Sequence, residues 1–304
     1  MRAYSLVTTV FNDQKEILEY MKNISEQTYQ PSEIIIADGG STDKTTDIIE
    51  EFSKGIEIPV KIITGKRLNI AEGFNEAIKI ARYELIGISA VGNIYDKDFY
   101  KNLIHTLDRE ELDAVYAPVR GLDCNRFSKK YNNMFLNGND GERILSNHGF
   151  VARKEVFEEL GYYYEGFYYA GEDTEFAQRI SESRFKVRCE ENAKLYWKTP
   201  KNYSEFVKQI KYYYIASLQI HGVAVIYKSY KMICSIAFMF VMMFFSWRYF
   251  LIALSFFMIL HMVKAMQLKL SGGDFYLWFL KRYVQICFFV KYIKFGIGDN
   301  VVNR

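Results

Sequence analysis

Two acidic side chains stand next to each other at Glu172 and Asp173, in the stretch Gly-Glu-Asp-Thr-Glu. An ionised carboxylate can remove the proton from a hydroxyl group as that hydroxyl attacks an electrophilic carbon, which is general base catalysis. Acidic residues are also common in the first turn of a helix, where the positive end of the helix dipole stabilises them. The pair alone therefore predicts either a catalytic base with an acidic neighbour or the ordinary start of a helix.

A second acidic segment begins at Asp38 and continues with two glycines, Gly39 and Gly40. A carboxylate at the carboxyl end of a strand can accept hydrogen bonds from a nucleotide base or ribose, and glycine lets the backbone turn tightly beside a ligand. The alternative is an ordinary turn followed by a helix start. Asn12 and Asp13 hold a similar position after the first apolar run, so both segments are candidate binding sites.

Short β-branched runs alternate with amphipathic helical stretches from the N-terminus onward, which predicts an α/β fold with a mostly parallel sheet covered by helices on both faces. Strands are expected at residues 6–11, 34–37, 59–64, 85–89 and 114–117, and helices at residues 17–24, 43–52, 70–81 and 99–107. The polar residues that follow successive strands would then meet at the carboxyl edge of the sheet. Residues 119–147 show no clear periodicity, and we interpret them as a loop beside the site.

The order of these motifs resembles the beginning of family 2 glycosyltransferases of the GT-A fold. The similarity runs through residues 4–215 and includes the stretches 71–77 (Ala-Glu-Gly-Phe-Asn-Glu-Ala) and 171–175. The resemblance implies a Rossmann-like domain that binds a nucleotide-diphosphate sugar. It assigns to the nucleotide sugar the residues Val10, Asn12, Asp13, Asp38, Gly39, Gly40, Arg67, Gly73, Asn75, Gly92 and Asn93.

The same resemblance gives roles to the acidic pair. Asp173 would be the general base of an inverting transfer, and Glu172 would help to form the acceptor site. The aromatic residues of segment 162–169 would offer flat surfaces to sugar rings, although packing accounts for several of them equally well.

The sequence departs from the family after the strand expected at residues 85–89. The family places an Asp-x-Asp there to hold a divalent metal, Mg or Mn, on the sugar diphosphate, whereas this chain has Ala90-Val91-Gly92. Asn93 alone is a weak, neutral ligand for such a cation, so the replacement argues against a metal. Bases such as Lys66 or Arg67 could hold the diphosphate instead, metal could bind more weakly, or transfer could be lost.

The C-terminal residues 227–304 differ in kind, with ten Lys and Arg against two acids. Two uncharged runs, residues 232–247 and 249–263, predict an apolar helical hairpin at 229–266, or a pair of helices lying in one leaflet. Residues 275–295 mix aromatic and basic side chains and predict an interfacial helix. We therefore expect a catalytic domain at 1–226 and a membrane-associated region at 227–304, on the cytoplasmic face of the cell membrane, with no nucleic-acid partner.

These observations predict a non-processive transfer of one sugar to a hydroxyl of a lipid-linked or cell-surface glycan, as in polysaccharide biosynthesis at the cell envelope. Residues 209–213 replace the Gln-x-x-Arg-Trp of processive family members with Gln-Ile-Lys-Tyr-Tyr. Two alternatives remain at this stage. The chain could be a non-catalytic nucleotide-sugar-binding membrane protein, or, more remotely, a dinucleotide oxidoreductase, although no Gly-x-Gly-x-x-Gly follows the first strand.

Overall fold

The computed structural model describes residues 2–136, 141–167 and 170–221, together with scattered positions between 241 and 285. The chain divides into two compact units, Met1–Thr199 and Pro200–Arg304. The first unit contains both β-sheets, and the second contains α8 (Tyr203–His221), which the sequence analysis had assigned to the catalytic domain. The expected boundary at residue 226 lies outside the described residues and stays a prediction.

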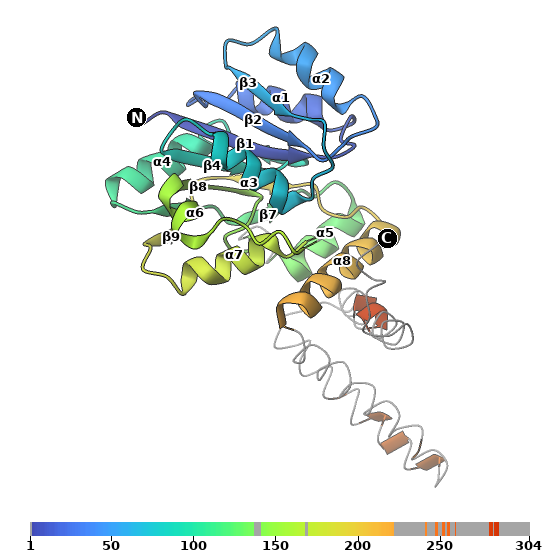
Figure 1. The fold of residues 1–304 in the computed structure, drawn as a ribbon. Coiled ribbons are helices and arrows are strands. Elements are labelled where there is room, and N and C mark those ends of the chain that lie inside the picture. Colours follow the sequence, from blue (N-terminus) through green and yellow to red (C-terminus); the bar gives the residue numbers. More distant parts are fainter. Residues whose placement is uncertain are drawn as a thin grey trace. The chain divides into compact units, whose positions relative to one another are not determined.

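Seven strands of the first unit form one twisted sheet in the order β3-β2-β1-β4-β8-β6-β9 (Figure 1). Strands β1 to β4 run parallel, whereas β8 runs antiparallel to both β4 and β6. A small second sheet has the order β5-β10-β7. The strands are β1 (Tyr4–Val10), β2 (Glu33–Asp38), β3 (Val60–Ile63), β4 (Leu85–Ser89), β5 (Asn93–Tyr95), β6 (Ala114–Tyr116), β7 (Val119–Gly121), β8 (Gly149–Arg153), β9 (Val187–Cys189) and β10 (Leu195–Trp197).

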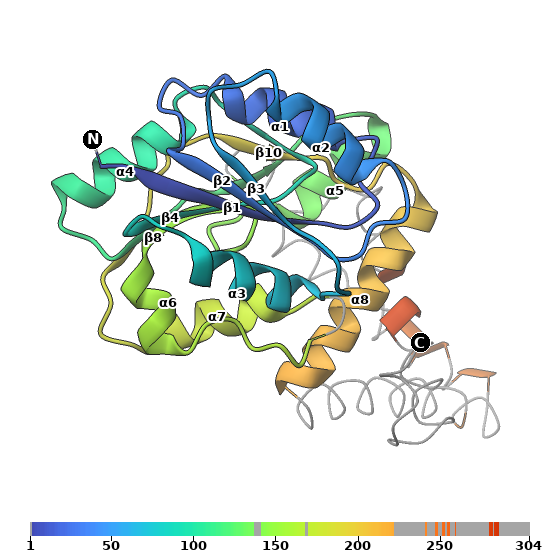
Figure 2. The same ribbon diagram turned by 45° about the horizontal axis from the view of Figure 1, so that its top comes forward.

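Helices cover both faces of the large sheet, which confirms the predicted α/β class. Figure 2 shows α1 and α2 above the sheet and α3, α6 and α7 below it. The remaining helices of this unit are α4, which packs on the α1 face, and α5. The helices are α1 (Ile17–Ser25), α2 (Thr45–Ser53), α3 (Ile70–Ile80), α4 (Phe99–Arg109), α5 (Arg126–Phe135), α6 (Lys154–Leu160) and α7 (Glu172–Ser181).

The alternation of side chains along each strand creates a core on either face of the sheet. In β2, Ile34 and Ile36 pack with α1, whereas Ile35 and Ala37 pack with α3. All four side chains are buried. Because both faces of a central parallel strand are covered, such strands are apolar throughout rather than alternating.

The loop predicted at residues 119–147 is partly wrong, since it contains β7 and α5. Helix α5 begins with a capping box in which Asn125 accepts from the N–H of Ser128 and the Ser128 hydroxyl faces the N–H of Asn125. Its buried face includes Asn132, which donates to Asp123 and accepts from Thr199. The apolar residues of this helix, Phe127, Tyr131, Met134 and Phe135, do recur at helical spacing, so the sequence held a signal that the interpretation as a loop overlooked.

The predicted hairpin at 229–266 and the interfacial helix at 275–295 lie almost entirely outside the described residues. Among the helices that the structure does describe, none combines the length and the apolar character needed to cross a bilayer.

Candidate active site

Several of the predicted site residues lie at the carboxyl edge of the large sheet. Strands β2 and β3 lie on one side of β1 and β4 lies on the other, so the strand order reverses between β1 and β4. Open α/β sheets bind ligands in the crevice outside the strand ends at such a reversal. Val10 at the end of β1 pairs in register with Asp38 at the end of β2, and Gly92 and Asn93 follow β4.

The turn after β2 is organised by the Asp38 carboxylate, which is buried and accepts the N–H of Ser41 on both oxygens at 3.1 Å. Gly40 has a φ of +89°, where a side chain would be strained. A Cβ on Gly39 would lie 2.9 Å from the carbonyl oxygen of Leu68. The two glycines therefore permit a turn that other residues would distort.

The loop after β1 is fastened to this same turn. The N–H of Asn12 donates to the Ser41 hydroxyl, and the Asn12 amide oxygen accepts from the N–H of Thr42, both at 2.9 Å. Burial raises the pKa of the Asp13 carboxyl, although the N–H of Phe11 lowers it in part. Asn12 thus stabilises the Asp38 turn through two hydrogen bonds, while the Asp13 carboxylate accepts a hydrogen bond from the backbone of its own loop.

An open pocket of about 460 Å³ lies beside Asp38. Lys66 at its rim forms an ion pair with Glu76 at 3.1 Å. Arg67 is exposed, and its guanidinium has no hydrogen-bond or ion-pair partner among the residues that the structure describes. The lining of the pocket therefore includes both a buried acid, Asp38, and an exposed cation, Arg67. Its lining consists of Asp38, Gly40, Ser41, Thr46, Glu50, Thr64, Gly65, Lys66 and Arg67.

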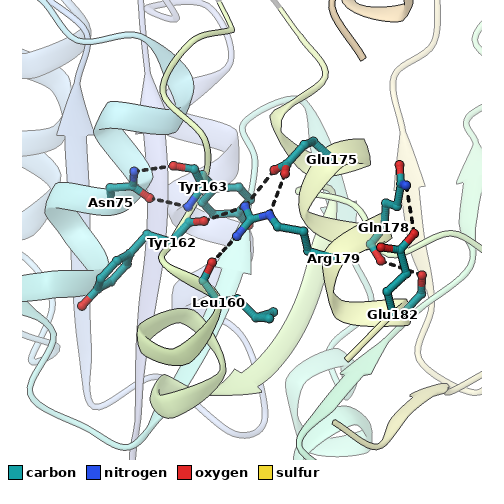
Figure 3. A network of polar contacts seen from close by, with 9 residues as sticks. Asn75, Leu160, Tyr162, Tyr163, Glu175, Gln178, Arg179 and Glu182 are labelled. Carbon is teal, nitrogen blue, oxygen red and sulfur yellow. Dashed lines mark hydrogen bonds and ion pairs between the residues drawn. The ribbon is translucent and has the colours of Figure 1, made fainter. Parts of the chain in front are cut away.

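Gly73 and Asn75, two further residues predicted to contact the nucleotide sugar, take part in packing in this structure. A Cβ on Gly73 would lie 2.8 Å from the Thr9 methyl group, so this glycine lets α3 approach β1. Asn75 is buried, and its amide donates to the Tyr163 carbonyl and accepts from the N–H of Tyr163 (Figure 3). The same amide also donates to Glu165. A direct contact of Asn75 with a ligand stays a prediction; both of its amide hydrogens are used, so a ligand could reach only the second lone pair of the amide oxygen.

Arg179 of α7 holds the other side of the same aromatic segment. Its guanidinium donates to the carbonyl oxygens of Leu160 and Tyr162 and pairs with both oxygens of Glu175 (Figure 3). Together, Asn75 and Arg179 fix the backbone between α6 and α7 from two helices. This segment leads directly to the acidic pair.

The acidic pair occupies the first turn of α7, after Gly171 with a φ of +110°. Glu172 is buried and accepts a hydrogen bond from the Asn147 amide at 3.0 Å, and the Tyr163 hydroxyl donates to Asn147 at 2.6 Å. The Asp173 side chain is half-buried. Asn147 therefore connects the aromatic segment to the acidic pair.

Burial, and after it the neighbouring charge of Asp173, raise the pKa of the Glu172 carboxyl from 4.5 to about 7. Burial also raises the pKa of Asp173, opposed by hydrogen bonds from the N–H groups of Thr174 and Asn147. Both carboxyls therefore hold a proton more tightly than they would in water, and Glu172, with its pKa at about 7, is partly protonated at neutral pH. A proton-holding Glu172 beside a carboxylate at Asp173 would give the two adjacent carboxyls distinct roles.

The turn after β4 is tied to the residue that precedes β8. Asn93 is buried, its NH₂ group donates to the carbonyl oxygens of Ala90 and His148, and its amide oxygen faces Nδ1 of His148 at 3.0 Å. Tyr95 donates to the His148 carbonyl at 2.6 Å. Gly92 has a φ of +89° and open space where a Cβ would be.

Comparison with known proteins decides the family. The model described as glycosyl transferase family 2 matches residues 5–168, which is 164 of the 304 residues. The chain belongs to glycosyl transferase family 2. The predicted family and the prediction of an enzyme, a glycosyltransferase, are thereby confirmed.

Named relatives of this family 2 member include the dolichyl N-acetyl-alpha-D-glucosaminyl phosphate 3-beta-D-2,3-diacetamido-2,3-dideoxy-beta-D-glucuronosyltransferase of Methanococcus voltae, 28% identical over 69% of this chain and 71% of that protein. The mannosyltransferase PcManGT of Pyrobaculum calidifontis, solved with GDP-Man and Mn2+, has a TM-score of 0.69 at 14% identity over 95% and 86% of the two chains. S. aureus TarS 1-349, solved with UDP-GlcNAc, has a TM-score of 0.53 at 18% identity over 71% and 66%. These two structures support the GT-A fold.

The divalent metal implied by the family resemblance does not fit the residues present. Residues 90–92 carry no side-chain oxygen, and the amide oxygen of Asn93 is a single neutral ligand that already accepts a hydrogen bond from His148. Mg and Mn favour carboxylate and water oxygens. Within the described ranges, no three His, Cys, Asp or Glu side chains come together as a metal site. Among the residues that the structure describes, no other set of acidic ligands replaces the missing Asp-x-Asp of this family 2 enzyme.

Sequence reasoning missed Asn147 and His148, which connect the two halves of this family 2 site. Asn147 is the last residue of the segment interpreted as a loop, and His148 directly follows it. A signal was present, because they immediately precede a strand, and the antiparallel pairing of Gly149 with Ser89 places that beginning beside the end of β4. The direction of β8 cannot be deduced from its own sequence, so this proximity stayed hidden.

Replacing Glu172 by Gln is expected to remove a pH dependence of stability. A carboxyl whose pKa is raised in the folded state binds its proton more tightly there, so its contribution is present below pH 4.5 and is lost as the pH rises through about 7. The difference in unfolding free energy between variant and wild type should therefore grow in favour of the variant from pH 5 to pH 8, by on the order of 1–3 kcal/mol. Urea unfolding at both pH values measures it, and a difference that does not change with pH would contradict this protonation state.

Proposed function

We propose that this glycosyltransferase moves a sugar from a nucleotide-diphosphate donor to a hydroxyl of a lipid-linked glycan, with inversion and one sugar per reaction. The observation that carries the proposal is the acidic pair of α7, joined through Asn147 and His148 to the carboxyl edge where the pocket beside Asp38 lies. The donors GDP-Man and UDP-GlcNAc found in related structures support the nucleotide-sugar class.

In the proposed reaction, Asp173 accepts the proton of the acceptor hydroxyl. The hydroxyl oxygen forms a bond to the anomeric carbon as the bond from that carbon to the diphosphate oxygen breaks. The nucleoside diphosphate leaves with the electron pair, and attack from the opposite face inverts the configuration. Glu172, neutral when protonated, hydrogen-bonds the acceptor without adding a second charge.

The leaving diphosphate requires positive charge, and Arg67 is the cation available at the pocket. Its unpaired guanidinium can form bidentate hydrogen bonds with phosphate oxygens. Glu76 already partly neutralises Lys66, so we assign the larger share to Arg67. This arrangement would stabilise the developing charge with protein groups alone.

The experiment is a screen of UDP- and GDP-sugars for nucleoside diphosphate release by the purified full chain, with membrane lipid extract as acceptor. Lipid-dependent release should occur with one donor, and EDTA should lower it by less than about twofold, because the donor set for a cation is missing. Arg67→Ala should lower kcat/KM by about 10- to 100-fold, since a charged hydrogen bond contributes about 1.5–3 kcal/mol.

Arg82→Ala is the matched control, because Arg82 is an exposed arginine at the amino end of β4 that pairs with Glu33. It should retain wild-type release. Loss of activity in EDTA that manganese restores would overturn metal independence. Donor binding without release from any nucleotide sugar would overturn the proposed transfer.

The lipid-linked acceptor is supported by the dolichyl substrate in the name of the M. voltae relative and by the basic, apolar residues 227–304. We place the catalytic unit on the cytoplasmic face of the membrane for the same reason. We expect the full chain to stay bound to membranes when they are washed with alkaline carbonate. Complete release of the chain by carbonate would contradict this location.

A further inference from the structure

His148 lies between the two parts of the proposed reaction centre. It immediately precedes β8, whose first residue, Gly149, pairs with Ser89 at the end of β4. Its side chain contacts Asn93 after β4, while the next residue back, Asn147, contacts Glu172. The imidazole is therefore located between the turn at residues 90–92 and the acidic pair.

The hydrogen bonds of Asn93 determine which nitrogen of His148 carries the proton. The amide NH₂ of Asn93 faces two carbonyl oxygens, those of Ala90 and His148, which can only accept hydrogen bonds. The opposite atom of the amide is therefore its oxygen, and it lies 3.0 Å from Nδ1 of His148. Since that oxygen can only accept, Nδ1 is the protonated nitrogen and Nε2 has a free lone pair.

The surroundings of the ring keep it neutral and leave Nε2 available. Burial lowers the pKa of His148 to about 4, and the ring packs against Trp197 with centroids 4.8 Å apart. In the part of the chain that the structure describes, Nε2 has no hydrogen-bond partner, and it is not completely enclosed by the protein. A fixed, accessible acceptor is thus aimed away from Asn93.

We propose that Nε2 of His148 accepts a hydrogen bond from a hydroxyl group of the sugar being transferred, and that it selects among sugars by this contact. The proposal rests on the proposed function. The proposed function places the diphosphate at the carboxyl edge of the sheet and the base on α7, and His148 with Asn147 connects the end of β4 at that edge to the acidic pair. A phosphate at neutral pH offers no proton to a lone pair, and a metal ion would need further ligands, whereas a sugar hydroxyl is a donor.

Two substitutions separate this role from a structural one. His148→Asn places an amide NH₂ near the position of Nδ1, so it can keep the bond to Asn93 while removing the acceptor at Nε2. His148→Gln reaches the position of Nε2 with an amide oxygen and can restore acceptance in part. UDP and GDP binding by calorimetry should be the same in wild type and both variants, because neither nucleoside diphosphate carries the sugar.

The test compares kcat/KM for the best donor from a panel of UDP-glucose, UDP-galactose, UDP-GlcNAc and GDP-mannose with its monodeoxy analogues. In the wild type, one deoxy position should reduce kcat/KM by about tenfold or more, the effect of one hydrogen bond of about 1.4 kcal/mol. His148→Asn should lower kcat/KM for the parent donor but not for that analogue, so the preference falls to about one, and His148→Gln should restore part of it.

An unchanged preference for the hydroxylated donor in His148→Asn would overturn the proposal while leaving the proposed transfer intact. If the wild type turns over no donor, the proposed function fails, and calorimetric binding of each parent and deoxy donor then tests His148 separately. Equal loss of affinity for parent and deoxy donors on substitution would in that case reject the contact.

Discussion

Asp173→Asn is expected to lower kcat for sugar transfer by about 100- to 10,000-fold, the range in which a positioned general base contributes. The amide keeps the shape of the side chain and can retain a bond from the N–H of Thr174, but it cannot remove a proton from the acceptor. Donor binding should remain within about twofold of wild type, because the base acts on the acceptor. Steady-state release of nucleoside diphosphate and calorimetry with the nucleotide sugar measure the two effects.

Glu182→Gln at the other end of the same helix is the control, since its carboxylate contacts Gln178 away from the acidic pair. It should leave kcat unchanged. Equal losses of binding and turnover in Asp173→Asn would contradict a general base, and an unchanged kcat would move that role to another group.

Arg179→Ala is expected to lower the free energy of unfolding by about 2–4 kcal/mol. The change removes hydrogen bonds to the carbonyl oxygens of Leu160 and Tyr162 and leaves the Glu175 carboxylate without its cation. Transfer should fall as well, because the segment leading to the acidic pair loses one of its two anchors. Urea unfolding followed by circular dichroism measures the stability.

Arg184→Ala is the matched control, because it also removes one guanidinium group. Arg184 also meets both oxygens of a glutamate, Glu159, but its side chain is 76% exposed. Exposed ion pairs contribute about 0–1 kcal/mol, so this variant should unfold almost like wild type. Equal destabilisation in the two arginine variants would mean that the contacts with the carbonyl oxygens do not hold the segment.

The strands and helices of the first half of the chain could be predicted because each carries its own pattern. Ile34, Ile35 and Ile36 are buried on both faces of the sheet, and a continuous apolar run of this length indicates such a strand. In α3, Phe74, Ala77 and Ile78 recur at helical spacing, and the structure gives Ile70–Ile80 where residues 70–81 were expected. Local spacing was enough for these elements.

The partners of polar side chains could not be predicted in the same way. Asn75 was assigned to the nucleotide sugar from its motif, yet its amide meets Tyr163, which lies 88 residues further along the chain. The positions of Asn147 and His148 at the site follow only from the direction of β8. An amide or imidazole shows in the sequence what it can donate or accept, but the identity of its partner depends on tertiary structure.

The antiparallel direction of β8 also affects the length of chain that separates contacting residues, and this length differs between the two halves of the site. The turns at Asn12 and Asp38 come from consecutive β/α units and meet across about 30 residues. His148 reaches Asn93 only when 55 residues of intervening chain have been brought back. Longer closures cost more conformational entropy and slow folding. We therefore expect the half around Asp38 to form from contacts that are closer in sequence than those of the half around His148.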